Sequence, residues 1–167
     1  KTNGRQNFGV AILSKYPVIA KGDVLFENQS KSDANYCVFI DVLKGKDTFR
    51  IYNVHLQSIR LMPADYSVFD KNTTATDETK STIRLMADKL LIAFPKRADQ
   101  ARIVMEHVNT SPYPTIVCGD FNDTPLSYTY NQFNKSLNDA FRYCSYGIGT
   151  TYVGKVPAGR IDYIFCS

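Results

Sequence analysis

The sequence lacks tryptophan altogether, and it contains only two histidines and four cysteines among its 167 residues. No two cysteines are close enough to form a Cys-x-x-Cys motif, which argues against a zinc site built on such pairs. The chain also has no apolar run long enough to span a membrane and no secretory-signal pattern. We find no internal repeat and no low-complexity tract.

Strong positive charge is missing too. The formal net charge at pH 7 is +4, and the basic residues are scattered along the chain. A DNA-binding arm would show a run of Lys and Arg, and single-strand binding would need an aromatic stacking platform. Neither pattern is found, so a nucleic-acid-binding module is the weaker interpretation. The small positive charge is compatible with an anionic substrate.

Three of the four cysteines, Cys37, Cys118 and Cys166, lie inside or beside apolar runs. Free buried thiols are the usual state of such residues, and they favour a reducing compartment such as the cytoplasm. A disulfide pair stays open, because connectivity cannot be read from spacing.

What the chain does contain is the composition of one globular domain over residues 1–167, with 44% of residues hydrophobic and 22% charged. Aromatic and β-branched residues cluster in short runs, which favours strands. The strands that we expect are Phe8–Leu13, Val18–Phe26, Tyr36–Leu43, Thr48–Leu56, Thr115–Cys118, Gly147–Val153 and Arg160–Cys166.

Helical periodicity appears between the fourth and fifth of these runs. It predicts one helix from about Ser81 to Phe94, ended by Pro95, and a second from about Lys96 to His107. The inner stripe of the second helix would be Ala98, Ala101, Val104, Met105 and Val108. The long segment Gln57–Lys80 has no clear period and is typical of a functional loop or a mobile insertion. Residues 126–133 are either a helix or an irregular turn, and residues 138–141 stay ambiguous. The mixture predicts a layered α/β domain with mainly antiparallel pairing.

The most informative motif is Gly119-Asp120-Phe121-Asn122, directly after an apolar run. On an extended backbone, side chains two residues apart point the same way, so Asp120 and Asn122 would face one cleft. A carboxylate can take a proton from water, and a carboxamide can hold a phosphoryl oxygen. The pair therefore suits phosphate ester hydrolysis.

Two other segments also place a polar side chain that could take part in such a reaction on an apolar strand. His55 shares a strand face with Asn53 at the end of an apolar strand, although a core histidine bonded to backbone is the structural alternative. Asp162 lies within an apolar strand and would need a partner there. That partner is either Arg160, in a salt bridge, or an imidazole that the carboxylate orients.

Four segments, residues 7–17, 53–56, 119–122 and 160–164, resemble in order and rough spacing the endonuclease/exonuclease/phosphatase superfamily, the deoxyribonuclease-I-like hydrolases. The resemblance covers nearly all of the chain. It implies an α+β fold, a four-layered α/β/β/α sandwich of mainly antiparallel sheets with the site at one rim. It also implies cleavage of phosphodiesters or phosphomonoesters with Mg²⁺ or a similar ion such as Mn²⁺. Substrates in the family include nucleic acids and phospholipid headgroups.

Carried over by position, the resemblance gives each residue a role. Asp120 would orient or deprotonate the attacking water and weakly contact the metal. Asn122 would bind the scissile phosphate and help to fix Asp120, with Asn53 beside it as a further substrate contact. His55 would donate to a non-bridging oxygen, and Asp162 would hold a second histidine in its productive tautomer.

Two family features have no counterpart in this sequence: the early segment with the metal-binding Glu and the final Ser-Asp-His segment. We therefore interpret the chain as an internal part of the domain, incomplete at both ends. By itself it is expected to bind metal weakly and to have little or no activity. A catalytically inert binding or scaffold domain of the same fold is the alternative. A metal-ligand Glu upstream and a Ser-Asp-His downstream in the natural protein would favour the enzyme.

Overall fold

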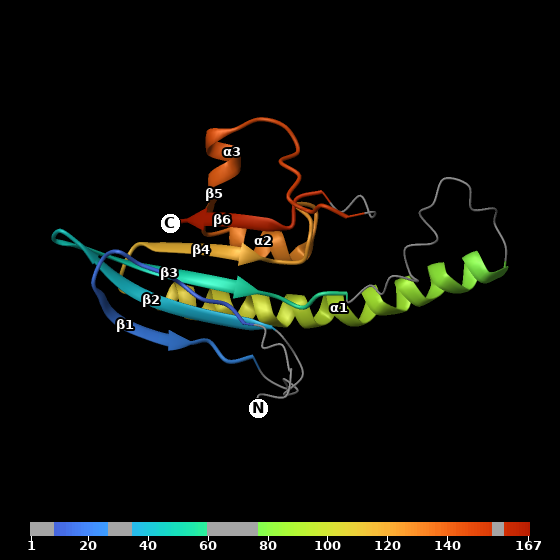
Figure 1. The fold of residues 1–167 in the computed structure, drawn as a ribbon, viewed down its shortest axis with the longest axis horizontal. Coiled ribbons are helices and arrows are strands. Elements are labelled where there is room, and N and C mark those ends of the chain that lie inside the picture. The colour runs from blue at the N-terminus through green and yellow to red at the C-terminus, as the bar shows by residue number, and fades with distance from the viewer. Residues whose placement is uncertain (1–8, 27–34, 60–76, 155–158) are drawn as a thin grey trace, which may run out of the picture.

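The computed structural model describes residues 9–26, 35–59, 77–154 and 159–167. These residues form the strands β1 (Val18–Asp23), β2 (Tyr36–Lys44), β3 (Asp47–His55), β4 (Thr115–Asp120), β5 (Asn138–Asp139) and β6 (Asp162–Cys166) and the helices α1 (Asp77–Asn109), α2 (Tyr128–Asn134) and α3 (Ala140–Cys144). Figure 1 shows their arrangement.

The strands make one six-stranded sheet in the order β1-β2-β3-β4-β6-β5. Neighbouring strands are antiparallel except for β3 and β4, which are parallel and are joined through α1. A parallel pair needs such a crossover, whereas β2 and β3 need only the tight turn at residues 45–46. The prediction of an α+β fold with mainly antiparallel pairing is confirmed.

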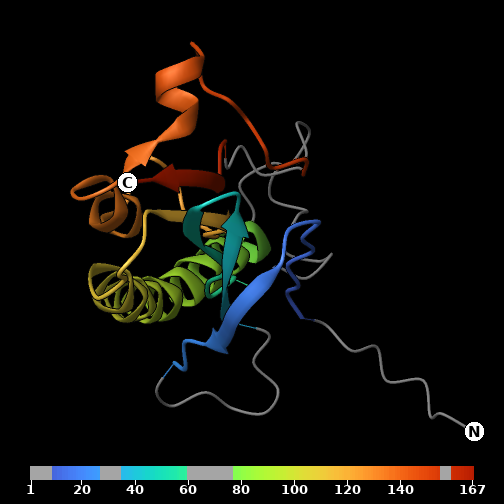
Figure 2. The same ribbon diagram turned by 90° about the vertical axis from the view of Figure 1, so that its left-hand side faces the viewer.

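Helices α1 and α2 cover one face of the sheet, as Figure 2 shows. Strand β3 alternates accordingly: Tyr52 and Val54 are fully buried beneath the helices, whereas Asn53 and His55 lie on the other face and are partly exposed. The helices contribute buried apolar residues to the same core, among them Ala101, Val104, Met105, Val108, Tyr130 and Phe133. The predicted inner stripe of residues 98–108 is therefore largely confirmed.

The prediction of two helices separated at Pro95 is wrong, because α1 continues through this residue. A proline inside a helix removes one hydrogen bond, and it costs about 3 kcal/mol. Here Pro95 is exposed, so water can bind the carbonyl that loses its donor. Ala93 before the proline and Arg97 after it are both buried. The helix is therefore packed against the rest of the fold on both sides of Pro95.

Two expected strands are absent from the described residues. The segment 9–13 pairs with no described strand, and Leu13 is 96% exposed. Residues 147–153 form a loop, in which the Thr151 hydroxyl oxygen accepts the backbone N–H groups of Ile161 and Asp162. The backbone N–H groups of Thr151 and Tyr152 donate to the Gly159 carbonyl. Residues 1–8, most of the predicted loop 57–80 (residues 60–76) and residues 155–158 lie outside the described residues.

The ambiguous segments have definite structures. Residues 128–134 are helical, and residues 138–144 form β5 followed directly by α3. Within the part of the chain that is described, no helix is both long and apolar enough to cross a membrane.

Candidate active site

Three of the predicted site residues lie in one row at one edge of the sheet. His55 ends β3 and is the register partner of Asp120, which ends β4. Asp120 in turn pairs with Asp162, the first residue of β6. Because paired residues on neighbouring strands share a face, the imidazole and the two carboxylates gather at the same place.

Asp120 is the centre of this row. Its Oδ2 lies 3.9 Å from Nε2 of His55, and its Oδ1 accepts the backbone N–H of Asn122 over 2.8 Å. Burial raises the pKa of the Asp120 carboxyl above its ordinary value, and the charge of Asp162 raises it further. The N–H of Asn122 and the positive charges of His55 and Arg97 oppose this rise. A carboxylate with a raised pKa is the better proton acceptor.

The backbone at Asn122 differs from the prediction. Strand β4 ends at Asp120, and Asn122 has a φ of 52°, so the two side chains do not sit on one extended segment. The chain leaves the sheet here, and asparagine tolerates the left-handed region better than most residues. The side chain of Asn122 nevertheless contacts the end of β3. Its Nδ2 donates to the carbonyl of Leu56, the residue directly after this strand, over 3.0 Å. Asn122 therefore ties the end of β3 to the turn after β4.

Asn53 lies on the same face as His55, two residues farther from the strand end. Its Nδ2 donates to the carbonyl of Ala11 over 3.0 Å. The carboxamide thus contacts the segment that precedes β1. A role for Asn53 in substrate binding stays a prediction.

Of the two partners considered for Asp162, the ion pair with Arg160 is wrong. Arg160 donates through Nη1 and Nη2 to the two carboxylate oxygens of Asp139, over 3.0 and 2.7 Å, and both residues are buried. Asp162 is exposed rather than buried in the strand. Since β6 begins only at Asp162, Arg160 precedes the strand and the alternation that linked the two side chains does not apply.

One turn of α1 contacts both segments that follow the site strands. Arg97 places Nε 3.6 Å from Oδ2 of Asp123, directly after the Gly-Asp-Phe-Asn motif, and both side chains are buried. Three residues along, Oε1 of Gln100 accepts the backbone N–H of Gln57, two residues after His55, over 2.8 Å. This helical turn therefore contacts the chain on both sides of the candidate site.

Arg97, Gln100 and Arg102 lie together on this part of α1. The ion pair is the observed state of Arg97, and Arg102 pairs with Glu106 on the exposed side of the helix. The role of Asp123 was missed, although its place beside the motif was a signal. Burial lowers the pKa of Arg97, and in the described structure its Nε and Nη2 have no hydrogen-bond partner.

His107, the second histidine, lies far from this row, at the end of α1 and on the helix-covered face. Its Nδ1 is 2.7 Å from the Tyr52 hydroxyl. The carboxyl end of a helix favours a charged imidazole, but burial opposes it here. Burial, helped by nearby Arg50, lowers the pKa of His107, so the neutral form is preferred.

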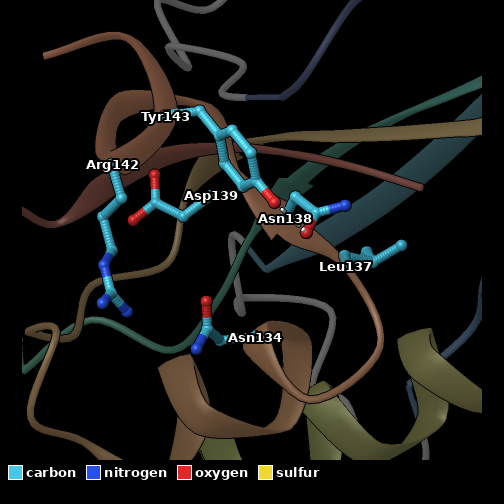
Figure 3. A pocket seen from close by; sticks show the side chains of 6 residues that line it. All are labelled: Asn134, Leu137, Asn138, Asp139, Arg142 and Tyr143. Carbon is cyan, nitrogen blue, oxygen red and sulfur yellow. Dashed lines mark hydrogen bonds between the residues drawn. The ribbon is translucent and has the colours of Figure 1, made fainter.

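Two depressions lie near the carboxyl-terminal elements. A cavity of about 580 Å³ adjoins Asp120 and Asp162 and extends along Phe141, Cys144 and Ile164. Figure 3 shows a separate pocket of about 420 Å³ beneath α3, in which the Tyr143 hydroxyl lies 3.3 Å from Oδ1 of Asn138. Its lining includes none of the predicted site residues.

The described residues contain no group of three or more His, Cys, Asp and Glu side chains that could hold a metal ion. Mg²⁺ commonly binds through one or two carboxylates together with water and substrate oxygens. Asp120 and Asp162 are carboxylates of this kind, but they do not make a complete protein cage. All four cysteines are free thiols, and burial raises the pKa of Cys37 to about 12.

The fold is shared with solved structures. The catalytic domain of human Nocturnin, with bound sulfate, matches 91% of this chain at 18% identity and a TM-score of 0.53, and the chain covers 48% of it. A mannosyl-6-phosphatase from Bacteroides thetaiotaomicron matches 91% at 17% identity and a TM-score of 0.56, with 53% of it covered.

Danio rerio TDP2, complexed with a single-strand DNA product, matches 89% of this chain at 15% identity and a TM-score of 0.54, with 52% of it covered. This chain therefore spans about half the length of each of these structures, and the low identities limit the likeness to the fold. No curated protein matches the chain significantly. The profile of the endonuclease/exonuclease/phosphatase family matches residues 2–167, and the chain belongs to this family.

Proposed function

We propose that this chain carries catalytic residues of a divalent-metal-dependent phosphoester hydrolase. The observation that supports this most directly is the row His55–Asp120–Asp162, in which an imidazole and two carboxylates from three separate strands meet at one sheet edge. The family, and the mannosyl-6-phosphatase and the complex with a DNA product among the related structures, are compatible with the same reaction class.

In this proposal Asp120 accepts the proton of the attacking water, because its raised pKa makes it a better base than an ordinary aspartate. His55, 3.9 Å away, donates to a non-bridging oxygen of the phosphoryl group and stabilises its growing charge. The Asn122 amide has two protons, of which one bonds Leu56, so the other is available to the phosphate.

Asp162 has two roles in the proposal. Its carboxylate lies in register beside Asp120 and raises the pKa of that group. The family resemblance further gives it a second histidine to orient, and this role stays a proposal. Mg²⁺ or Mn²⁺, when bound near these carboxylates, would neutralise charge on the phosphoryl oxygens.

The test uses the natural full-length protein and bis(p-nitrophenyl) phosphate, with Mg²⁺, with Mn²⁺ and with a chelator. We expect hydrolysis that the chelator removes and the metal restores. Asp120→Asn should lower kcat about a hundredfold or more, the usual scale for a lost general base. Asp99→Asn, an exposed aspartate on α1, is the matched control and should keep the wild-type rate.

Turnover by Asp120→Asn at the wild-type rate would remove Asp120 from the role of base. Absence of hydrolysis with every phosphoester and metal would favour the alternative, an inert domain of the same fold.

A further inference from the structure

The first residue of β6 is Asp162, one of the two acids of the candidate site, and its register partner on β4 is Asp120. The backbone N–H of Phe121 donates to the carbonyl of Ile161 over 2.9 Å. In an antiparallel ladder, a bond between these flanking residues makes Asp120 and Asp162 a non-hydrogen-bonded pair, the kind whose side chains lie closer together. The two carboxylates therefore lie side by side in the tighter of the two arrangements that the ladder allows.

This arrangement is unfavourable at the end of a strand. Like charges directly opposite each other on neighbouring strands destabilise their pairing. The N–H and C=O groups of a non-hydrogen-bonded pair point away from the partner strand, so β4 does not bind the N–H of Asp162. Among the described residues, the other edge of β6 pairs with β5 at Phe165 and Cys166 alone, at the far end of the strand. The N–H of Asp162 thus needs a hydrogen-bond acceptor from outside the sheet.

The side chain of Thr151 supplies that acceptor. Its hydroxyl oxygen accepts the backbone N–H of Ile161 over 3.0 Å and the N–H of Asp162 over 3.1 Å. A hydroxyl oxygen has two lone pairs, so this side chain uses its full acceptor capacity on two consecutive residues. Ile161 is therefore bound on two sides, through its N–H to Thr151 and through its carbonyl to Phe121.

Thr151 is itself held by the loop in which it lies. The backbone N–H groups of Thr151 and Tyr152 donate to the carbonyl of Gly159 over 3.2 and 3.1 Å. Gly149, two residues before Thr151, lies against the Phe141 ring of α3, where a Cβ would come within 3.0 Å of three ring atoms. The hydroxyl oxygen thus belongs to a loop that is tied both to the segment before β6 and to α3.

We propose that Thr151 is a positioning residue of the candidate active site, which holds the carboxylate of Asp162 beside Asp120 by anchoring the backbone of Asp162. The inference rests on the proposed function, because it gives the anchored acid a part in the reaction. The role requires an oxygen atom: serine can also accept both N–H groups, whereas valine, which has nearly the shape of threonine, cannot. Misplacement of a reacting group by about 1 Å can lower a rate about a hundredfold, so the anchor affects turnover as well as the strand end.

The test measures two quantities in the natural full-length protein: amide hydrogen exchange at single residues, and hydrolysis of bis(p-nitrophenyl) phosphate with Mg²⁺. In Thr151→Val we expect the amides of Ile161 and Asp162 to exchange at least about tenfold faster, the scale of one lost hydrogen bond. The amide of Phe165, deeper in β6, should keep its wild-type rate. We expect kcat to fall about tenfold or more and KM to change less than about threefold, because the substrate still binds but the acid pair is misaligned.

Further variants separate the hydroxyl oxygen from the fold around it. Thr151→Ser retains the acceptor, so its exchange rates and kcat should stay within about threefold of wild type. Thr150→Val is the matched control, because Thr150 is the exposed neighbouring threonine and its hydroxyl makes no hydrogen bond among the described residues. It should leave both quantities unchanged. If Thr151→Val fails to fold, the smaller Thr151→Ala is measured in its place.

The outcomes separate this proposal from the proposed function. Unchanged exchange at Ile161 and Asp162 in Thr151→Val would refute the anchor, whatever the activity. Faster exchange with a wild-type kcat would refute the positioning role and keep the proposed function, and so would equal losses of kcat in Thr151→Val and Thr151→Ser. Absence of hydrolysis by the wild type with every phosphoester and metal would refute the proposed function, and faster exchange would then leave Thr151 a structural contact only.

Discussion

At the scale of single residues, Gly119 decides how closely the two parallel strands of the site approach. It has a φ of 138°, and a Cβ there would come within 3.0 Å of three backbone atoms of Val54. Val54 and Gly119 are register partners one step before His55 and Asp120. The glycine before Asp120 is therefore a requirement of the sheet as well as part of a motif.

Replacement of Gly119 by alanine should be severely destabilising, because neither the backbone angle nor the contact with β3 can accept a side chain. We expect a loss of more than about 4 kcal/mol in the free energy of unfolding, measured with urea. Gly45→Ala is the matched control: Gly45 has a φ of 67° but open space around its Cβ position. It should cost about 1–2 kcal/mol, and an equal loss at both positions would contradict the role of the close approach.

Residue patterns predicted the strand ends well and the ion pairs poorly. The predicted strands 48–56 and 115–118 end within one or two residues of the observed ends, His55 of β3 and Asp120 of β4. The meeting of these side chains therefore followed from the sequence together with the resemblance. The pairing of Arg160 with Asp139 did not, because Asp139 lies in a segment without clear periodicity. Long-range ion pairs depend on register, which no local pattern contains.

At the scale of elements, α1 both covers the core and contacts the site. The sequence predicted its inner face but ended it at Pro95, since local propensity carries no information about the burial that holds the helix on both sides. The turn after that proline places Arg97 beside Asp123 and Gln100 beside Gln57. The strands predicted at residues 9–13 and 147–153 do not form, for a related reason. A strand needs a partner strand, and apolar character alone does not supply one.

Arg97→Met tests the link between α1 and the turn after β4. Removing the cation leaves Asp123 buried and uncompensated, which typically costs about 3–5 kcal/mol. Arg102→Met on the same helix is the control, because the Arg102–Glu106 pair is exposed and such pairs contribute at most about 1 kcal/mol. Urea unfolding measures both losses, and similar values for the two variants would contradict the prediction.

A double variant separates stability from positioning. Arg97→Met with Asp123→Asn removes both charges, so it should recover much of the lost free energy of unfolding. It does not restore the ion pair beside the turn that carries Asp120. If the full-length protein hydrolyses phosphoesters, kcat should therefore stay low in the double variant while its stability returns. Recovery of both quantities would assign Arg97 a purely structural role.

At the scale of the whole molecule, the sheet separates two environments. The face beneath α1 and α2 holds the apolar core, and the other face carries Asn53 and the row His55–Asp120–Asp162. The two histidines of the chain are divided between them: His55 lies at the site, and His107 lies at the end of α1 against Tyr52. Of the two histidines, His55 alone is therefore placed to take part in chemistry at the candidate site.

His107 should make the stability of the whole fold depend on pH. Its neighbours are Tyr52, Phe39, Arg50 and Asp41, and burial followed by the charge of Arg50 lowers its pKa, against an opposing effect of Asp41. Because the pKa in the folded state lies below the unfolded value of about 6.5, the unfolded chain binds the proton first as the pH falls. The free energy of unfolding should therefore decrease as the pH drops below about 6.5.

The measurement is urea unfolding of wild type and His107→Gln at pH 7.5 and pH 5.5. Other groups titrate over this range in both proteins, so the difference between the two pH slopes isolates His107. We expect the variant to lose less stability on acidification than wild type, because it has no imidazole to protonate in the unfolded state. Identical slopes would mean that His107 is protonated equally in both states, and the neutral histidine of the folded protein would be refuted.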